Sequence, residues 1–140
     1  MRKGILLLIT AALLLSGCGA GEGSAVSGGS AYESAAAGGY TQISQEEAME
    51  MMKRDDGHII LDVRRQDEYD SGHIAGAVLL PNESITDTPP ESLPDKGQII
   101  LIYCRSGNRS KQAAEKLAAM GYTNIYEFGG INTWKGEIVT

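Results

Sequence analysis

The stretch IILIYCRSGNRSKQAAEKL, residues 99–117, carries one cysteine, Cys104, from an apolar run into a polar loop. The thiolate is the nucleophilic form of cysteine, and it is favoured beside cations and at helix N-termini. Arg105 and Arg109 supply cations, and Gly107 permits a tight backbone turn. An inert core cysteine needs none of these neighbours, so the pattern predicts a reactive thiol.

Two flanking elements must position this thiol. The apolar run before Cys104 is typical of a buried strand, and the residues after the loop show the spacing of an amphipathic helix. The thiol is thus expected at the carboxyl edge of a sheet, where open α/β proteins place their ligands. Backbone N–H groups of residues 105–109 and the helix dipole are expected to surround the sulfur and favour its anion.

The remaining elements predict the fold class. A helix is expected in residues 44–57, where Ser44 and Glu47 form a capping box. A second helix is expected after Cys104 and ends near Gly121. Continuous apolar runs are typical of strands buried on both faces of a parallel sheet. The expected strands cover residues 58–63, 75–81, 98–103 and 124–128. We predict one α/β domain with a mainly parallel sheet flanked by helices.

Composition bounds the class of protein. A chain of 140 residues holds one modest core. The net charge of -6 argues against nucleic acid as a partner. Two histidines without a Cys or acidic cluster at ligand spacing predict no metal site.

The N-terminus resembles that of a bacterial lipoprotein. Two cations precede an apolar stretch that is shorter than the roughly 20 residues of a membrane span, which indicates a secretory signal. The following LSGC resembles a lipobox, in which the cysteine receives a diacylglycerol. This predicts a signal peptide at 1–17, a lipidated Cys18 followed by a Gly/Ser/Ala tether through residue 39, and a folded domain at 40–140.

The resemblance also implies a location. The protein is expected to be exported and lipid-anchored on the non-cytoplasmic side of the membrane. With Cys18 given to lipid, Cys104 has no partner for a disulfide within the chain. A lone thiol in an oxidising compartment again favours a use for its reactivity.

Loop length separates two reaction classes. Cysteine phosphatases place five residues between the cysteine and the arginine, whereas CRSGNR places four. This spacing resembles the C-x-x-G-x-R loop of single-domain rhodanese-like sulfurtransferases. LDVRRQDEYDSGHIAGAVLLP, residues 61–81, and FGGINTWKGE, residues 128–137, are similar to two further signatures of that family, in the same order. Because the chain ends soon after Trp134, we expect the family's final strand to be trimmed.

The resemblance implies a rhodanese-like fold and a sulfurtransferase that works through a Cys104 persulfide without a cofactor. The donor would be a small anion such as thiosulfate, and the acceptor would be cyanide or a thiol, for instance that of a redox protein. The substrate-binding residues would be Arg105, Ser106, Gly107, Asn108 and Arg109. The alternative is a non-catalytic module at the membrane surface that carries sulfur or binds thiols.

Three further residues are expected to support the structure. Asp62 and Arg64 stand at a strand end, where alternation directs one of them inward, and we expect an internal ion pair. The resemblance makes His73 a turn residue whose imidazole bonds to nearby backbone rather than a catalytic base.

Overall fold

A computed structural model describes residues 39–140 of the protein. The predicted signal peptide, the lipid site at Cys18 and the tether up to residue 38 lie outside the described residues. Across residues 39–140, no helix has both the length and the apolar character needed to span a membrane. The domain boundaries therefore stay predictions.

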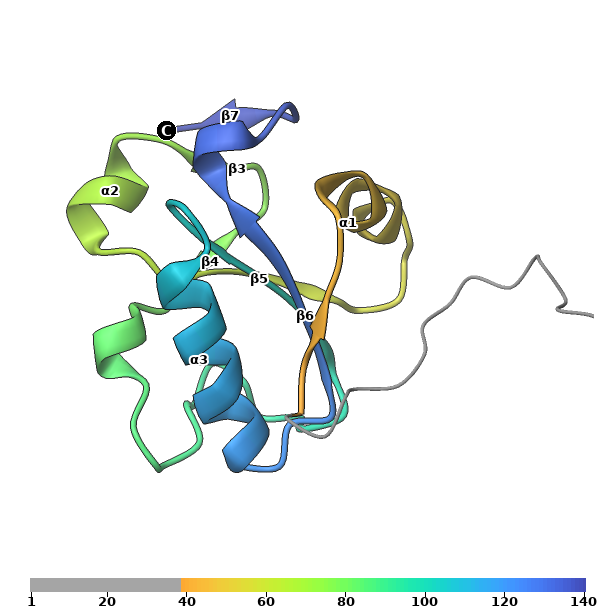
Figure 1. Cartoon of the computed structure of the whole chain (residues 1–140), viewed down its shortest axis with the longest axis vertical. Helices are drawn as coiled ribbons and strands as arrows, with labels where there is room; N and C mark the ends of the chain where they lie inside the picture. The colour runs from red at the N-terminus through yellow and green to blue at the C-terminus, as the bar shows by residue number, and fades with distance from the viewer. Residues whose placement is uncertain (1–38) are drawn as a thin grey trace, which may run out of the picture. The chain divides into compact units, whose positions relative to one another are not determined.

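The domain is built on a five-stranded sheet in which every neighbouring pair is parallel (Figure 1). In spatial order the strands are β1 (Thr41–Gln42), β6 (Asn124–Gly130), β5 (Ile99–Cys104), β2 (Ile59–Asp62) and β4 (Val78–Leu79). The two central strands, β5 and β2, are almost wholly buried, as expected of a sheet covered on both faces. The predicted α/β fold with a mainly parallel sheet is confirmed.

Two helices cover opposite faces of the sheet. α1 (Gln45–Met52) packs its buried Ala48 and Met51 on one face, and α3 (Asn108–Ala119) packs on the other. Residues of β5 alternate between these cores because successive side chains of a strand point to opposite faces. Tyr103 joins the α1 side, and Cys104 joins the α3 side. Alternation along one strand thus directs the thiol toward α3.

The C-terminal end of α3 is fixed by a Schellman motif. The N–H of Gly121 donates to the carbonyl of Ala118 at 3.0 Å, and the N–H of Tyr122 donates to that of Leu117 at 3.2 Å. Gly121 has φ +96°, which favours glycine. The predicted stop of this helix is therefore confirmed.

Several short elements were not predicted. They are α2 (Gln66–Asp70), the 3-10 turns η1 (Asn82–Ser84) and η2 (Ile131–Thr133), β1, and the antiparallel pair β3 (His73–Ile74) and β7 (Ile138–Val139). The expectation of a trimmed final strand was wrong, because β7 pairs with β3. The first helix ends at Met52 rather than near residue 57, and the strand expected at 75–81 is only the two residues of β4.

Candidate active site

Cys104 is the last residue of β5, at the carboxyl edge of the sheet. The residue is only 1% exposed and belongs to the core between the sheet and α3. Three loop residues then lead to Asn108, where α3 begins. The strand, the loop and the helix therefore meet at the sulfur.

Gly107 shapes the loop. It is the N-cap residue of α3 and has φ +105°, a conformation that strains residues with a side chain. In this conformation its N–H donates to Cys104 Sγ at 3.0 Å. Amide N–H groups at the N-terminus of a helix carry partial positive charge. We call this arrangement around Sγ, formed by residues 105–110, the cradle.

The cradle changes the acidity of the thiol. Burial raises the pKa of Cys104, because it penalises the charged thiolate. Hydrogen-bond donors from Ser110, Gly107 and Ser106 act the other way and outweigh burial, so the pKa lies below its ordinary value. The site therefore favours thiolate more than a free cysteine does, as a nucleophile requires.

β6 supports the cradle from behind. Gly130 pairs with Cys104 in the sheet, and the N–H of Asn132 donates to the carbonyl of Arg105 at 3.2 Å. A methyl group on Gly130 would overlap the backbone of Arg105 and lie 2.5 Å from the amide nitrogen of Ser106. The loop thus packs against a position that admits only glycine.

Arg109 forms a bidentate ion pair with Glu68 of α2. Its Nη1 donates to Glu68 Oε2 at 2.6 Å, and its Nη2 donates to Oε1 at 2.9 Å. Glu68 also accepts the backbone N–H of Arg65 at 3.2 Å, which caps α2. The guanidinium predicted to bind substrate is therefore already engaged, and Glu68 fixes the first turn of α3 to α2. The family signature includes Glu68, but the sequence alone did not assign it a partner.

The ion pair makes stability depend on pH. The hydrogen bonds from Arg109 lower the pKa of Glu68 to about 2, although burial opposes them. A depressed carboxyl pKa stabilises the fold above the unfolded value, near 4.5, and this contribution is lost as pH falls toward about 2. Replacing Glu68 with glutamine is expected to cost about 1.5–3 kcal/mol at pH 7, the range for hydrogen bonds to charged groups.

Urea unfolding at pH 7 and at pH 2 checks this prediction. The difference in unfolding free energy between wild type and Glu68→Gln should be large at pH 7 and small at pH 2. Glu46→Gln, at an exposed position on α1, is the matched control and should change little at either pH. A difference for Glu68→Gln that did not depend on pH would contradict the ion-pair account.

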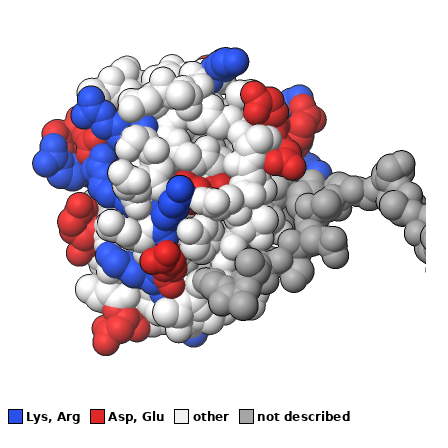
Figure 2. Space-filling view, viewed as in Figure 1, with Lys and Arg blue, Asp and Glu red and all other residues white. Residues whose placement is uncertain are grey.

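The other predicted loop residues lie at the surface. Arg105, Ser106 and Asn108 are exposed, whereas Gly107 is buried. Figure 2 shows Lys and Arg side chains gathered on the side of the molecule that bears α2, and acidic side chains over α1. Because Arg105 directly follows the nucleophile and is exposed, it is available to an anion at the mouth of the cradle.

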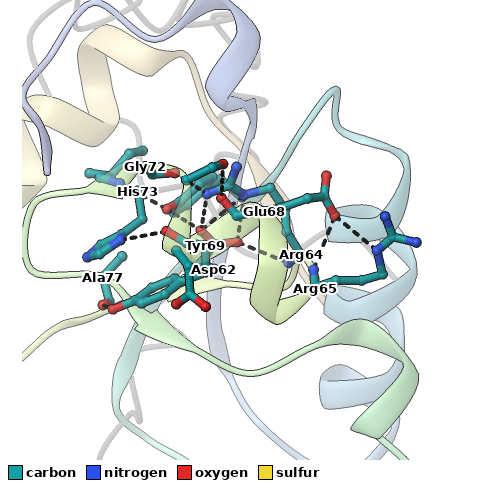
Figure 3. A network of polar contacts seen from close by, with 12 residues as sticks. Asp62, Arg64, Arg65, Glu68, Tyr69, Gly72, His73 and Ala77 are labelled. Atoms are coloured by element: carbon teal, nitrogen blue, oxygen red, sulfur yellow. Dashed lines mark hydrogen bonds and ion pairs between the residues drawn. The ribbon is translucent and has the colours of Figure 1, made fainter. Parts of the chain in front are cut away.

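Asp62 and Arg64 form a buried ion pair near this edge of the sheet (Figure 3). Arg64 Nη2 donates to Asp62 Oδ2 at 2.7 Å and to the carbonyl of Gly72 at 2.7 Å. The Tyr103 hydroxyl donates to Asp62 Oδ2 at 2.6 Å and accepts the N–H of Ile74 at 3.1 Å. Burial and the bond to Asp62 raise the pKa of Tyr103, which keeps this hydroxyl protonated. The network ties β2, β5 and β3 together.

His73 contacts α2 rather than the thiol. Its Nδ1 lies 2.9 Å from the carbonyl oxygen of Tyr69, and its ring stacks on the Tyr69 ring at 3.7 Å (Figure 3). The Tyr69 hydroxyl donates to the carbonyl of Ala77 at 2.7 Å. The contacts are those of a turn residue. Within residues 39–140, no group of three His, Cys, Asp or Glu side chains is arranged to hold a metal ion.

Two residues beside the cradle were missed by sequence reasoning. Ser110 is fully buried in the first turn of α3, and Glu127 of β6 is only 3% exposed. The Ser110 hydroxyl donates to Glu127 Oε1 at 2.6 Å. The available signal was an acidic residue inside a predicted buried strand, which requires a buried hydrogen-bond partner.

A parallel α/β sheet whose central strand ends in a cysteine ringed by N–H donors defines a cysteine-dependent α/β domain. The sequence pattern of the rhodanese-like domain matches residues 44–137. The chain belongs to the rhodanese-like family, and its loop CRSGNR stands at the family's catalytic position.

Named relatives and a solved structure agree with this assignment. Thiosulfate sulfurtransferase GlpE of Coxiella burnetii is 38% identical over 99 residues, which cover 70% of this chain and 90% of that protein. Thiosulfate sulfurtransferase PspE of Escherichia coli is 35% identical over 71 residues, 51% of this chain and 68% of that protein. A structure described as rhodanese with anions from E. coli superposes with a TM-score of 0.55 at 31% identity, covering 59% of this chain and 98% of that one.

Proposed function

We propose that this protein is a sulfurtransferase in which Cys104 carries the transferred sulfur as a persulfide. The observation that carries the proposal is the buried sulfur at the end of β5, bonded by the Gly107 N–H and lowered in pKa. The relatives named thiosulfate sulfurtransferases support the same reaction class. The short loop disfavours phosphate chemistry.

The proposed reaction has two displacements at sulfur. The Cys104 thiolate attacks the outer sulfur of thiosulfate, a new S–S bond forms, and sulfite leaves with the electron pair of the bond that breaks. Cyanide or a thiolate then attacks the outer sulfur of the persulfide and regenerates the Cys104 thiolate. Both steps start from an anion, so the cradle needs to stabilise negative charge rather than supply a base.

Steady-state turnover tests the proposal. With excess thiosulfate and cyanide, the protein should release many equivalents of thiocyanate, and the Cys104→Ala protein should release none above the uncatalysed rate. A module that only carries sulfur would load once and stop after one equivalent. Release of a single equivalent, or of none, would contradict catalysis.

We also propose that the donor is a small anion. A doubly negative donor gains from the exposed Arg105 beside the nucleophile and from the N–H groups of the cradle. Arg105→Ala is expected to raise KM for thiosulfate by about tenfold, one lost charge-assisted contact, with less effect on an uncharged polysulfide. Initial rates with both donors check this. Equal effects on the two donors would show that Arg105 only shapes the loop.

We further propose attachment to a membrane through a diacylglycerol on Cys18. Gly39 lies against Ala118, near the C-terminal end of α3, whereas Cys104 lies at the N-terminal end of that helix. A chain entering at Gly39 therefore leaves the cradle unobstructed. Two acyl chains add about 0.8 kcal/mol per buried methylene, enough for durable anchoring.

Cys18→Ser tests the anchor. This change should release the protein from the membrane fraction or leave it unprocessed, because the acceptor thiol is gone. Sulfur transfer by the released protein should match wild type, since residue 18 is no part of the cradle. Fractionation and intact mass measure both effects. A Cys18→Ser protein that is processed and retained like wild type would contradict lipid attachment.

A further inference from the structure

Glu127 is a buried carboxylate directly behind the cradle. Its Oε1 accepts the Ser110 hydroxyl at 2.6 Å and the N–H of Gly129 at 2.9 Å, and its Oε2 lies 3.4 Å from Gln42 Nε2. These three donors are neutral. A methyl group on Gly107 would lie 3.8 Å from Glu127 Oε1, so the carboxylate is in close proximity to the loop backbone. An acid so deeply buried among neutral donors is uncommon and points to a role.

The Ser110 hydroxyl has one proton and several acceptors. Glu127 Oε1 lies at 2.6 Å, the carbonyl of Gly107 at 3.0 Å and that of Gly129 at 3.4 Å. The hydroxyl also lies within hydrogen-bonding reach of Cys104 Sγ. A hydroxyl donates to one strong acceptor, and a carboxylate at this distance is the strongest of these. Donation to Glu127 and donation to the thiolate therefore exclude each other.

We propose that Glu127 is a positioning residue of the active site that holds the Ser110 proton away from Cys104. With Glu127 ionised, Ser110 turns its oxygen, and not its proton, toward the sulfur. The oxygen then accepts from the thiol and favours the protonated form. The thiolate is stabilised by the backbone N–H groups alone, so the hydroxyl does not add to the lowering of the Cys104 pKa.

The consequence is a thiolate of moderate rather than extreme stability. Nucleophilicity falls as the thiol pKa falls, so an over-stabilised thiolate attacks sulfur slowly. A cradle that uses every available donor would also retain the persulfide anion. By withholding one donor, Glu127 favours both loading and release. This consequence rests on the proposed sulfur transfer, but the position of the Ser110 proton does not.

Glu127 reaches water without passing the mouth of the cradle. It lines a cavity of about 380 Å³ together with Gln42, Gln45, Lys111 and Thr133. The carboxylate can therefore exchange protons from the side of β1 and α1. Other charged or titratable groups near the pair or the loop are Arg105, Arg109 and Lys111 beside the cradle, Glu68 on α2, Glu83 on η1, and Tyr40 ahead of β1.

The test is the titration of the Cys104 thiol in full-length variants. The rate of alkylation by iodoacetamide is followed against pH at the peptide that contains Cys104. Glu127→Gln is expected to lower the thiol pKa by about one unit, because the glutamine amide donates to Ser110 and turns the hydroxyl proton toward sulfur. The Ser110→Ala/Glu127→Gln protein should titrate like Ser110→Ala alone, because no hydroxyl remains to turn.

Two results would overturn the proposal. One is an unchanged or raised thiol pKa in Glu127→Gln. The other is a shift of the same size in the Ser110→Ala background, which would show that Glu127 acts through its charge alone. Glu115→Gln, at an exposed position on α3, removes an equal charge and should leave the thiol pKa unchanged.

Ser110→Ala alone decides the matter if Glu127→Gln does not fold, which circular dichroism reports. Under the proposal Ser110 accepts from the thiol, so its removal leaves the thiol pKa unchanged or lowers it. A raised pKa would show that Ser110 donates to the thiolate and would overturn the proposal. The titration uses no sulfur donor, so its outcome is independent of whether the protein transfers sulfur.

Discussion

Replacing Gly130 with alanine is expected to reduce kcat/KM for sulfur transfer by about a hundredfold, the effect of displacing a reacting group by about 1 Å. The added methyl would meet backbone atoms of Arg105 and Ser106, which cannot rotate away as a flexible side chain can. Either the loop or β6 must shift, and Cys104 is paired to Gly130 across that contact. The N–H groups would then no longer converge on the sulfur.

Initial rates and the pH dependence of Cys104 alkylation measure this effect together. The thiol pKa should rise in Gly130→Ala, because donors to the thiolate are displaced. Gly97→Ala is the matched control: Gly97 lies in a turn where a methyl would be 3.3 Å from the Asp95 carboxylate. That variant should keep wild-type rates. Wild-type activity in Gly130→Ala would show that the cradle does not depend on its packing against β6.

Asp62→Asn is expected to destabilise the domain by about 3–5 kcal/mol, the cost of leaving a buried charge without its partner. Arg64 is 5% exposed and Asp62 is fully buried, so water cannot replace the lost carboxylate. The amide would also present a donor to Tyr103 or Arg64, which are themselves donors. Asp62 does not contact the sulfur in this network, so activity per folded molecule should be retained.

Urea unfolding measures the loss. Asp67→Asn serves as the control, since Asp67 pairs with Arg65 at 3.3 Å where both side chains are largely exposed, and such pairs contribute about 0–1 kcal/mol. A loss in Asp62→Asn no larger than in Asp67→Asn would mean that the buried pair is not a structural support. A folded but inactive Asp62→Asn would instead place Asp62 in the chemistry.

The elements predicted from sequence are those with long and uniform patterns. The apolar run of β5 and the helical spacing of α3 each determine one element and its burial, so the cysteine at their junction was placed correctly in the fold. The elements missed were short. α2 has five residues, and β3 and β7 pair two residues each over a long separation, so local patterns contain almost no signal for them.

The contacts around the cradle were less predictable for a different reason. Glu68 lies 41 residues before Arg109, and Glu127 lies 17 residues after Ser110. Which charges meet depends on the strand order and on the register of β6 against β5, which the sequence does not encode locally. The sequence therefore indicated two free arginines at the site, whereas the structure leaves only Arg105 exposed and commits Arg109 to Glu68.

The account depends most directly on a persulfide at Cys104. Incubating the protein with thiosulfate, without an acceptor, and then measuring intact mass and the mass of the Cys104 peptide tests this claim. We expect a gain of one sulfur atom on that peptide, its loss on adding cyanide, and no gain in Cys104→Ala. A wild-type protein that gains no sulfur from thiosulfate or any other sulfane donor, or that gains it equally in Cys104→Ala, would contradict the account.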